Sequence, residues 1–151
     1  MAEELFEEAL KLEPDMVEAI SGLGSIIEHR MTDELDTKRK EQFLNIAEAH
    51  HEKALSLLPD NPDVITNYAS FLQANRGNRQ NEAEELYQRV LSGDPEHACA
   101  LGHLAGFYNA RGRRHEAMEL AERAFLLQPW RKDFSTLLED FPESRYYRLA
   151  T

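Results

Sequence analysis

The chain has 151 residues, of which 42% are hydrophobic and 30% charged, a composition typical of one folded domain that can bury a core. Its first ten residues, MAEELFEEAL, carry four glutamates where a secretory signal would carry basic and apolar residues, and no apolar run approaches the roughly 18 residues of a membrane-spanning helix. We therefore expect a soluble protein without a membrane segment. The single cysteine, Cys99, excludes an internal disulfide, which suits a reducing compartment such as the cytoplasm or nucleus.

The formal net charge of −11 is distributed unevenly along the chain. Residues 1–36 carry 11 acidic and 2 basic side chains, whereas residues 97–151 carry 7 and 8. An acidic surface repels polyanions, and no basic run interleaved with aromatic residues offsets this repulsion, so we expect no nucleic-acid binding. If charge selects the partner, the partner is basic; the alternative is that the acidic residues only form a solvated surface.

Proline follows an apolar stretch at four places, KLEPD, SLLPD, SGDPE and LLQPW, with spacings of 45, 36 and 34 residues. Alanine lies twelve residues before each of these prolines, and alanine or valine lies five residues before each. The position eight residues before is occupied by Phe6, His51, Tyr87 and Ala121. A converging period with small residues in fixed columns is typical of arrays of closely packed helix pairs.

These columns, together with the stretches ISGLGSI, ITNYASFL and LGHLAGFY, resemble the tetratricopeptide repeat family over most of the chain. The resemblance implies an all-α fold: a right-handed superhelical solenoid of antiparallel helix pairs, with about three repeat units and a C-terminal closing helix. Pentatricopeptide repeats fit less well because they resemble RNA binders, and the acidic charge of this chain disfavours RNA binding. The half-repeats of RNA-processing scaffolds carry more aromatic residues than this chain.

In chain order, residues 1–14 are predicted to form a half repeat, consisting of a second helix without its first helix. A repeat with an insertion follows at 15–60, where Asp15 and Glu18 form a capping box for the first helix and the second helix spans 37–58. The insertion includes TDELDTKRKEQ. Helical spacing in the residues that follow it favours a projecting helix over an irregular loop.

Two repeats of ordinary length are predicted next, at 61–95 and 96–129. Asn61 and Asp94 are the expected caps of their first helices, each followed by a proline in the first helical turn. Their second helices are expected at 79–92 and 113–127. A closing helix lies within 130–140, with a core at Lys132 to Glu139, and residues 141–151 are predicted to be a tail.

In this family the ligand usually lies against the concave faces of the first helices. The resemblance therefore implies a groove that binds a protein or peptide segment. The surface of this groove is small, polar and nearly free of cations, and it is lined by Glu18, Ser21, Ser25, Glu28, Asp63, Asn67, Ser70, Cys99, Gly102, His103, Gly106 and Asn109. The amide of Asn67 either holds the partner's backbone or bonds within its own helix pair. Gly102 and Gly106 each weaken the helix by about 1 kcal/mol relative to alanine, so they either make room for a partner side chain or allow tight helix packing.

Family members that grip the C-terminal carboxylate of heat-shock chaperones resemble one another in a clamp of lysine, asparagine, asparagine, lysine and arginine. The corresponding positions here are Ser21, Ser25, Asn67, Cys99 and His103. Only Asn67 agrees, and the ammonium and guanidinium groups that bind a carboxylate are missing. We therefore do not expect binding through the usual carboxylate clamp.

Residues for catalysis or metal binding are few. Cys99 and His103 lie one helical turn apart with His97 nearby, which is a weak pattern for a metal site or a thiolate–imidazole pair. His51 falls in the aromatic packing column rather than in a metalloprotease motif. No glycine-rich phosphate loop, nucleophile elbow or acidic dyad occurs in the sequence. We expect no catalytic residue, no metal and no cofactor.

The sequence thus predicts a non-catalytic scaffold for protein–protein interaction that binds a partner segment in its concave groove. One alternative is a structural array that assembles through uncapped ends, with weak self-association through the apolar residues of the N-terminal half repeat, Leu5, Phe6 and Leu12. Another is a chaperone adaptor that lacks the usual clamp.

Overall fold

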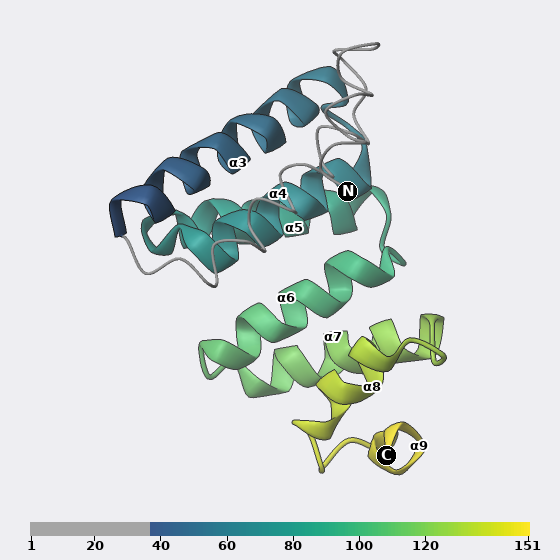
Figure 1. The fold of residues 1–151 in the computed structure, drawn as a ribbon. Coiled ribbons are helices and arrows are strands. Elements are labelled where there is room, and N and C mark those ends of the chain that lie inside the picture. Colours follow the sequence, from purple (N-terminus) through teal and green to yellow (C-terminus); the bar gives the residue numbers. More distant parts are fainter. Residues whose placement is uncertain (1–36) are drawn as a thin grey trace. The chain divides into compact units, whose positions relative to one another are not determined.

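A computed structural model describes the backbone of residues 37–151 and the side chains of residues 41, 42 and 44–151. Within this range all regular elements are helical and no strand occurs, which confirms the predicted all-α class (Figure 1). The chain divides into two compact units, Met1–Arg76 and Gly77–Thr151, which are described separately below. The helices and the capping box predicted before residue 31 lie outside the described residues.

The first unit contains α3 (Thr37–Leu57) and α4 (Pro62–Asn75). α3 has 21 residues and α4 has 14, so the predicted insertion is helical from Thr37 onward. Asn61 caps α4 as predicted: its side-chain oxygen accepts hydrogen bonds from the backbone N–H groups of Asp63 at 3.0 Å and Val64 at 3.1 Å. Pro62 begins the helix, where its missing N–H costs nothing.

Small residues let α3 and α4 approach closely. Ala47 and Ala54 on α3 are fully buried, as is Ala69 on α4. Between them lies His51, which is 2% exposed and has its ring centroid 5.1 Å from that of Phe71. His51 therefore packs as an aromatic core residue, as the column of the sequence predicted.

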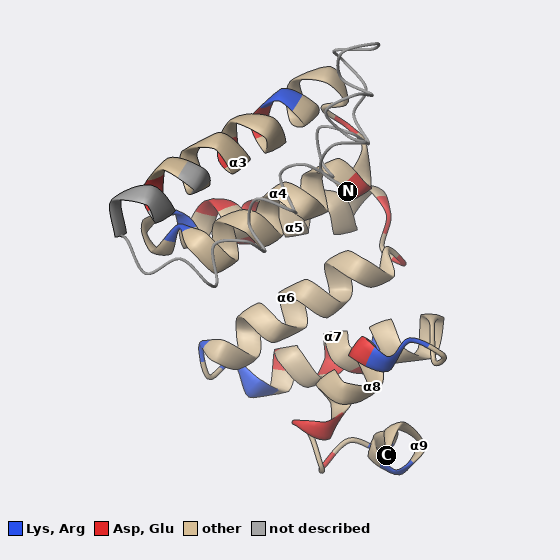
Figure 2. Ribbon diagram, in the orientation of Figure 1, with Lys and Arg blue, Asp and Glu red and all other residues tan. Residues whose placement is uncertain are grey.

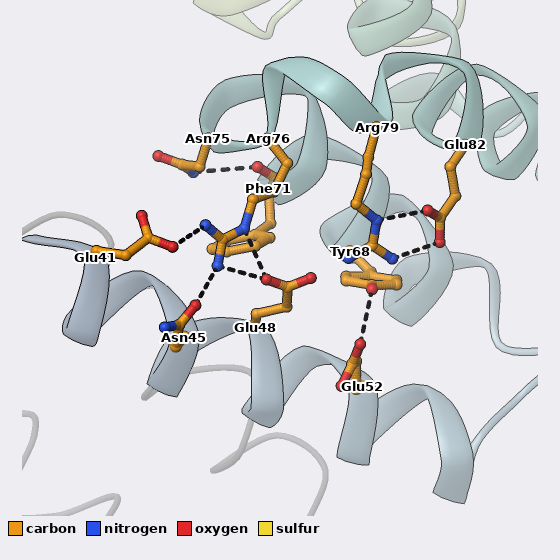
Figure 3. A network of polar contacts seen from close by, with 10 residues as sticks. All are labelled: Glu41, Asn45, Glu48, Glu52, Tyr68, Phe71, Asn75, Arg76, Arg79 and Glu82. Carbon is orange, nitrogen blue, oxygen red and sulfur yellow. Dashed lines mark hydrogen bonds and ion pairs between the residues drawn. The ribbon is translucent and has the colours of Figure 1, made fainter.

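A polar network joins the same two helices (Figure 3). The guanidinium of Arg76, which follows α4, donates to Glu48 Oε2 at 2.7 Å, to Glu41 Oε1 at 2.8 Å and to Asn45 Oδ1 at 2.7 Å. The hydroxyl of Tyr68 donates to Glu52 Oε1 at 3.3 Å. The four α3 residues share one helix face because they are spaced by three or four positions. This acidic face of α3 is therefore engaged with α4.

The second unit contains the remaining elements: η2 (Gly77–Arg79), α5 (Gln80–Gly93), α6 (Ala98–Ala110), α7 (Arg114–Leu127), α8 (Lys132–Glu139) and α9 (Tyr147–Ala150). α5, α7 and α8 agree with the two second helices and the closing helix expected from the sequence. The proposed repeat boundaries at 60, 95 and 129 all fall in connections between helices. The assignment of residues to repeats remains a prediction.

The predicted cap at Asp94 is wrong. α6 begins at Ala98, and His97 caps it by accepting a hydrogen bond from the Ala100 N–H at Nδ1, at 3.2 Å. Asp94 instead follows α5, and its carboxylate accepts from the backbone N–H of Glu96 at 3.1 Å. Pro95 consequently lies in the turn before α6 and not in its first helical turn.

The core of the second unit combines alanines with aromatic rings. The fully buried alanines are Ala83 on α5, Ala100 and Ala105 on α6, and Ala117, Ala121 and Ala124 on α7. The buried rings of Tyr87 and Phe107 meet edge to face with centroids 6.5 Å apart. Gly112 has a φ of 74° in the turn between α6 and α7, a backbone conformation that glycine adopts without a steric penalty.

A second arginine repeats the arrangement seen in the first unit. Arg113, in the turn after α6, donates to Glu84 Oε1 of α5 at 2.8 Å, and the Tyr108 hydroxyl donates to the same oxygen at 2.9 Å. The guanidinium carbon of Arg113 lies 3.7 Å from the Tyr108 ring centroid. In both units an arginine after one helix thus reaches a glutamate on the preceding helix.

Residues after α8, predicted to be a tail, pack against the rest of the second unit. Phe141 is fully buried and Ser144 is 6% exposed. The Ser144 hydroxyl donates to Glu122 Oε1 of α7 at 2.6 Å, and Arg114 donates to Glu143 Oε1 at 2.7 Å. The C-terminal residues therefore cover part of α7 and α8.

Candidate partner-binding surface

α6 carries five of the eight predicted groove residues that the structure describes. It contains no Lys, Arg, Asp or Glu, and Figure 2 shows it without charge along its whole length. Each of these five residues lies three or four positions from another member of the set, so they share one side of the helix: Cys99, Gly102, His103, Gly106 and Asn109. We call this set the α6 stripe.

One part of the α6 stripe opens into a pocket of about 170 Å³. The pocket is lined by Cys99, Gly102, His103, Arg131, Asp133, Phe134 and Leu137, so α6 and the start of α8 both contribute. α8 comes close because Gly102 has no side chain: a Cβ there would lie 2.6 Å from Cε1 of Phe134. The space left by Gly102 is therefore filled by the chain's own phenylalanine.

Arg131 places a guanidinium at the edge of the pocket. Its Nε donates to Asp133 Oδ1 at 3.0 Å, and its Nη2 donates to the second oxygen of the same carboxylate. Its Nη1 donates to Cys99 Sγ at 3.0 Å and to Gln128 Oε1 at 3.3 Å. The guanidinium carbon lies 4.3 Å from the Phe134 ring centroid. The hydrogen bonds from Arg131 to Asp133 lower the pKa of the Asp133 carboxyl, so Arg131 and Asp133 form a charged pair at neutral pH.

His103 forms another side of the pocket. Its ring is stacked on that of Tyr87, with centroids 6.0 Å apart and an interplanar angle of 10°, and part of the residue is exposed to solvent. Desolvation by the surrounding groups lowers the pKa of His103, and Asp133 opposes this shift. The imidazole is therefore uncharged at neutral pH.

The other two residues of the α6 stripe differ. A Cβ on Gly106 would have no neighbouring atom within 4 Å, so the space beside this glycine is open. The Asn109 amide donates to Asp140 Oδ2 at 3.3 Å and therefore already has a partner within the chain.

The remaining predicted groove residues lie elsewhere. On α4, in the first unit, Asp63 and Asn67 are exposed and Ser70 is half-buried. Thr66, their neighbour on α4, is only 1% exposed. Four predicted residues lie outside the described part of the chain: Glu18, Ser21, Ser25 and Glu28.

The sequence reasoning missed the contribution of α8. The expectation of a nearly cation-free surface did not include Arg131, whose charge is balanced by Asp133. The signal was present, because Asp133 follows Cys99 by 34 residues and Leu137 follows His103 by the same interval. Extending the repeat register by one more first helix would have placed α8 beside α6.

Two further properties concern residues 37–151. Nowhere in this range do three His, Cys, Asp or Glu side chains lie close enough together to hold a metal ion. Among the helices of the same range, none has the length and the apolar character required to cross a membrane.

A family model described as tetratricopeptide repeat matches residues 78–140, which include α5, α6, α7 and α8. Residues 78–140 therefore carry the tetratricopeptide repeat. The sequence predicted α6 and α7 as the repeat at 96–129 and α8 as the closing helix, and this assignment remains a prediction. No significant match is found among curated protein sequences.

Solved structures of tetratricopeptide repeat proteins are similar to this chain. TTC0263 of Thermus thermophilus is 18% identical with a TM-score of 0.77, covering 97% of this chain and 70% of that one. YrrB, described as having an unusual peptide-binding site, is 17% identical with a TM-score of 0.53, covering 87% and 79%. A human IFIT1 dimer with m7Gppp-AAAA is 19% identical with a TM-score of 0.71, covering 98% and 34%. This chain thus spans about a third of IFIT1. At these identities the likeness establishes the fold.

Proposed function

We propose that this chain is a non-catalytic scaffold that recognises a partner protein, and that the α6 stripe with its pocket anchors a segment of that partner. The observation that carries the proposal is the uncharged surface of α6, which combines a pocket of about 170 Å³ with open space at Gly106. A concave site that combines apolar and polar lining groups suits the side chains of a protein segment.

We favour a protein over a nucleic acid as the partner. Although the IFIT1 structure contains a capped RNA, this chain has a net charge of −11, and α6 carries no basic residue. Nucleic-acid binding depends on cations that neutralise phosphates, and the guanidinium at the pocket is already paired with Asp133. The peptide-binding site of YrrB supports a segment as the ligand.

The exposed polar side of α4 is proposed as a second contact for the same class of partner. The Asn67 amide can donate to and accept from a peptide backbone, and Asp63 favours basic residues nearby. Glu18 and Glu28, which lie outside the described residues, are predicted to add to this preference. A partner that carries basic residues as well as an apolar anchor is therefore expected.

Selection of random peptides displayed on phage tests the proposal. Peptides selected on the full chain are expected to lose binding to Gly106→Leu, because the leucine fills the open space of the α6 stripe. Ser92→Leu adds the same side chain at an exposed position of α5 and serves as the matched control. Asn67→Ala is expected to weaken binding a few-fold, which corresponds to about 1 kcal/mol for one hydrogen bond.

Circular dichroism verifies that each variant is folded. Retention of all selected peptides by folded Gly106→Leu would exclude the α6 stripe as the binding surface. The alternative of self-assembly through uncapped ends predicts a different result, namely concentration-dependent association of the chain without any peptide.

A further inference from the structure

We infer that the pocket between α6 and α8 selects an uncharged, apolar side chain of the size of leucine or methionine from the partner. That the side chain belongs to a protein segment rests on the proposed function. The pocket's preference for one class of side chain is the new point, and it follows from the charge balance, the hydrogen bonds and the shape of the lining residues.

An anionic group would find few donors in this pocket. Four of the five N–H groups of Arg131 already have acceptors: two bind the oxygens of Asp133, one binds Cys99 Sγ and one binds Gln128 Oε1. His103 is uncharged at neutral pH because desolvation lowers its pKa. A carboxylate that entered would also lie near the Asp133 carboxylate. The pocket therefore cannot replace the hydration that an anion loses.

A cationic group is disfavoured for the reciprocal reason. The Asp133 carboxylate is the acidic side chain of the pocket, and both of its oxygens accept from Arg131. An ammonium group that reached Asp133 would lie beside the guanidinium of Arg131, which repels it. Since Arg131 and Asp133 cancel each other, the lining has no net charge to attract either kind of ion.

The remaining lining favours an apolar side chain. The Phe134 ring, Leu137, the thiol of Cys99 and the bare backbone of Gly102 form its apolar surface. The volume of about 170 Å³ resembles that of apolar cavities, about 150 Å³, that hold a benzene molecule. Methionine gains an additional contact because its sulfur interacts favourably with an aromatic ring such as that of Phe134.

Titration of the full ¹⁵N-labelled chain with blocked amino acids tests the selection directly. N-acetyl-leucinamide and N-acetyl-methioninamide are expected to shift the backbone amide signals of Cys99, Gly102, His103 and Leu137 in a saturable manner. N-acetyl-aspartic acid α-amide and N-acetyl-lysinamide, whose side chains are charged at pH 7, are expected to bind at least tenfold more weakly. Equal binding of a charged probe, or no saturable shift with the apolar probes, would overturn the inference.

Two charge variants provide a gain-of-function test. Asp133→Asn frees N–H groups of Arg131 and should increase binding of the aspartate probe at least several-fold. Arg131→Gln leaves Asp133 uncompensated and should favour the lysine probe instead. Glu139→Gln, which removes an exposed carboxylate elsewhere on α8, is the matched control and should keep the wild-type preference. If one of the two variants does not fold, the other still tests the charge balance. A folded Asp133→Asn or Arg131→Gln variant that keeps the wild-type preference for apolar probes contradicts the charge-balance argument.

The two proposals can fail separately. Binding of the apolar probes in the pocket without any selected peptide would support the pocket's preference and count against the segment-binding function. Peptides that require Gly106 but bind without a leucine, methionine or similar side chain would support the function and overturn the pocket's preference.

Discussion

Gly102 and Gly106 lie four residues apart on one side of α6, yet their surroundings differ. Gly102 faces the buried ring of Phe134, whereas the space beside Gly106 is open. The sequence offered two explanations for these glycines, close helix packing or room for a partner. Packing accounts for Gly102, and room for a partner remains the proposal for Gly106.

Alanine at each position should therefore have opposite effects on stability. Gly106→Ala is expected to raise the free energy of unfolding by about 1 kcal/mol, because alanine favours a helix and meets no atom there. Gly102→Ala is expected to lower it by about 1 kcal/mol or more, because the Phe134 ring must move and overpacking outweighs the helix gain. Urea unfolding of both variants measures the difference; stabilisation by both would contradict the packing seen at Gly102.

Burial of His51 makes the stability of the protein depend on pH. Burial lowers its pKa from 6.5 to about 4, so the native protein holds it uncharged while the unfolded chain protonates it near pH 6.5. Its ring packs against Phe71, and its Nε2 has no hydrogen-bond partner. Unfolding is therefore coupled to proton uptake between pH 6.5 and about 4.

We expect this uptake to reduce the free energy of unfolding by up to about 3 kcal/mol as the pH falls from 6.5 to 4. His51→Phe keeps an aromatic ring and should flatten the pH dependence in this window. His115→Phe is the control, because His115 is exposed on α7 and should leave the slope unchanged. Urea unfolding at several pH values compares the three proteins. Equal slopes for wild type and His51→Phe would show that His51 does not titrate in this way.

At the scale of elements, arginines in the turns after α4 and α6 tie successive helices together. Arg76 and Glu48 are largely buried, with side chains 13% and 14% exposed, so loss of one partner leaves an unpaired charge in a poorly hydrated position. Arg79 and Glu82, which also appear in Figure 3, are three residues apart and more exposed. Exposed pairs of this kind contribute little.

Arg76→Met is accordingly expected to lower the free energy of unfolding by about 2 kcal/mol, since hydrogen bonds to charged groups are lost. Arg79→Met should change it by less than about 0.5 kcal/mol. A double-mutant cycle with Glu48→Gln isolates the coupling of Arg76 to Glu48. A coupling energy near zero would show that the network in Figure 3 does not stabilise the helix pair.

At the scale of the whole molecule, the second unit has the features of an independently folding part. Its helices α5 to α8 share a core of alanines and aromatic rings, and Phe141 and Ser144 cover the end of that core. The family model also matches within this unit, at residues 78–140.

We therefore expect a fragment of residues 77–151 to fold without the first unit. It should show helical circular dichroism and a cooperative thermal transition. Removing residues 141–151 from this fragment should abolish or strongly weaken the transition, because Phe141 is fully buried and a buried phenylalanine is worth about 3–5 kcal/mol. A fragment that lacks a cooperative transition would show that its core depends on the preceding helices.

The sequence by itself determined the helices and their small-residue columns. Alanines such as Ala47, Ala83 and Ala117 recur at fixed distances from prolines, and the Asn61–Pro62 pair marks a helix start, because these signals act through neighbouring residues of the chain. The cap at the start of α6 was missed because both Asp94 and His97 can cap a helix, and the choice depends on where α6 must begin in order to pack.

Only the tertiary structure decided how distant side chains meet. It brings Arg131 to Cys99 across 32 positions, fills the space of Gly102 with Phe134, and joins Arg76 to Glu48 across 28 positions. The direction of a long side chain depends on the packing and charge of elements that are far apart in the sequence, which a local pattern does not contain. The composition of the pocket therefore follows from the placement of α8 beside α6, although its residues stand in the repeat register of the sequence.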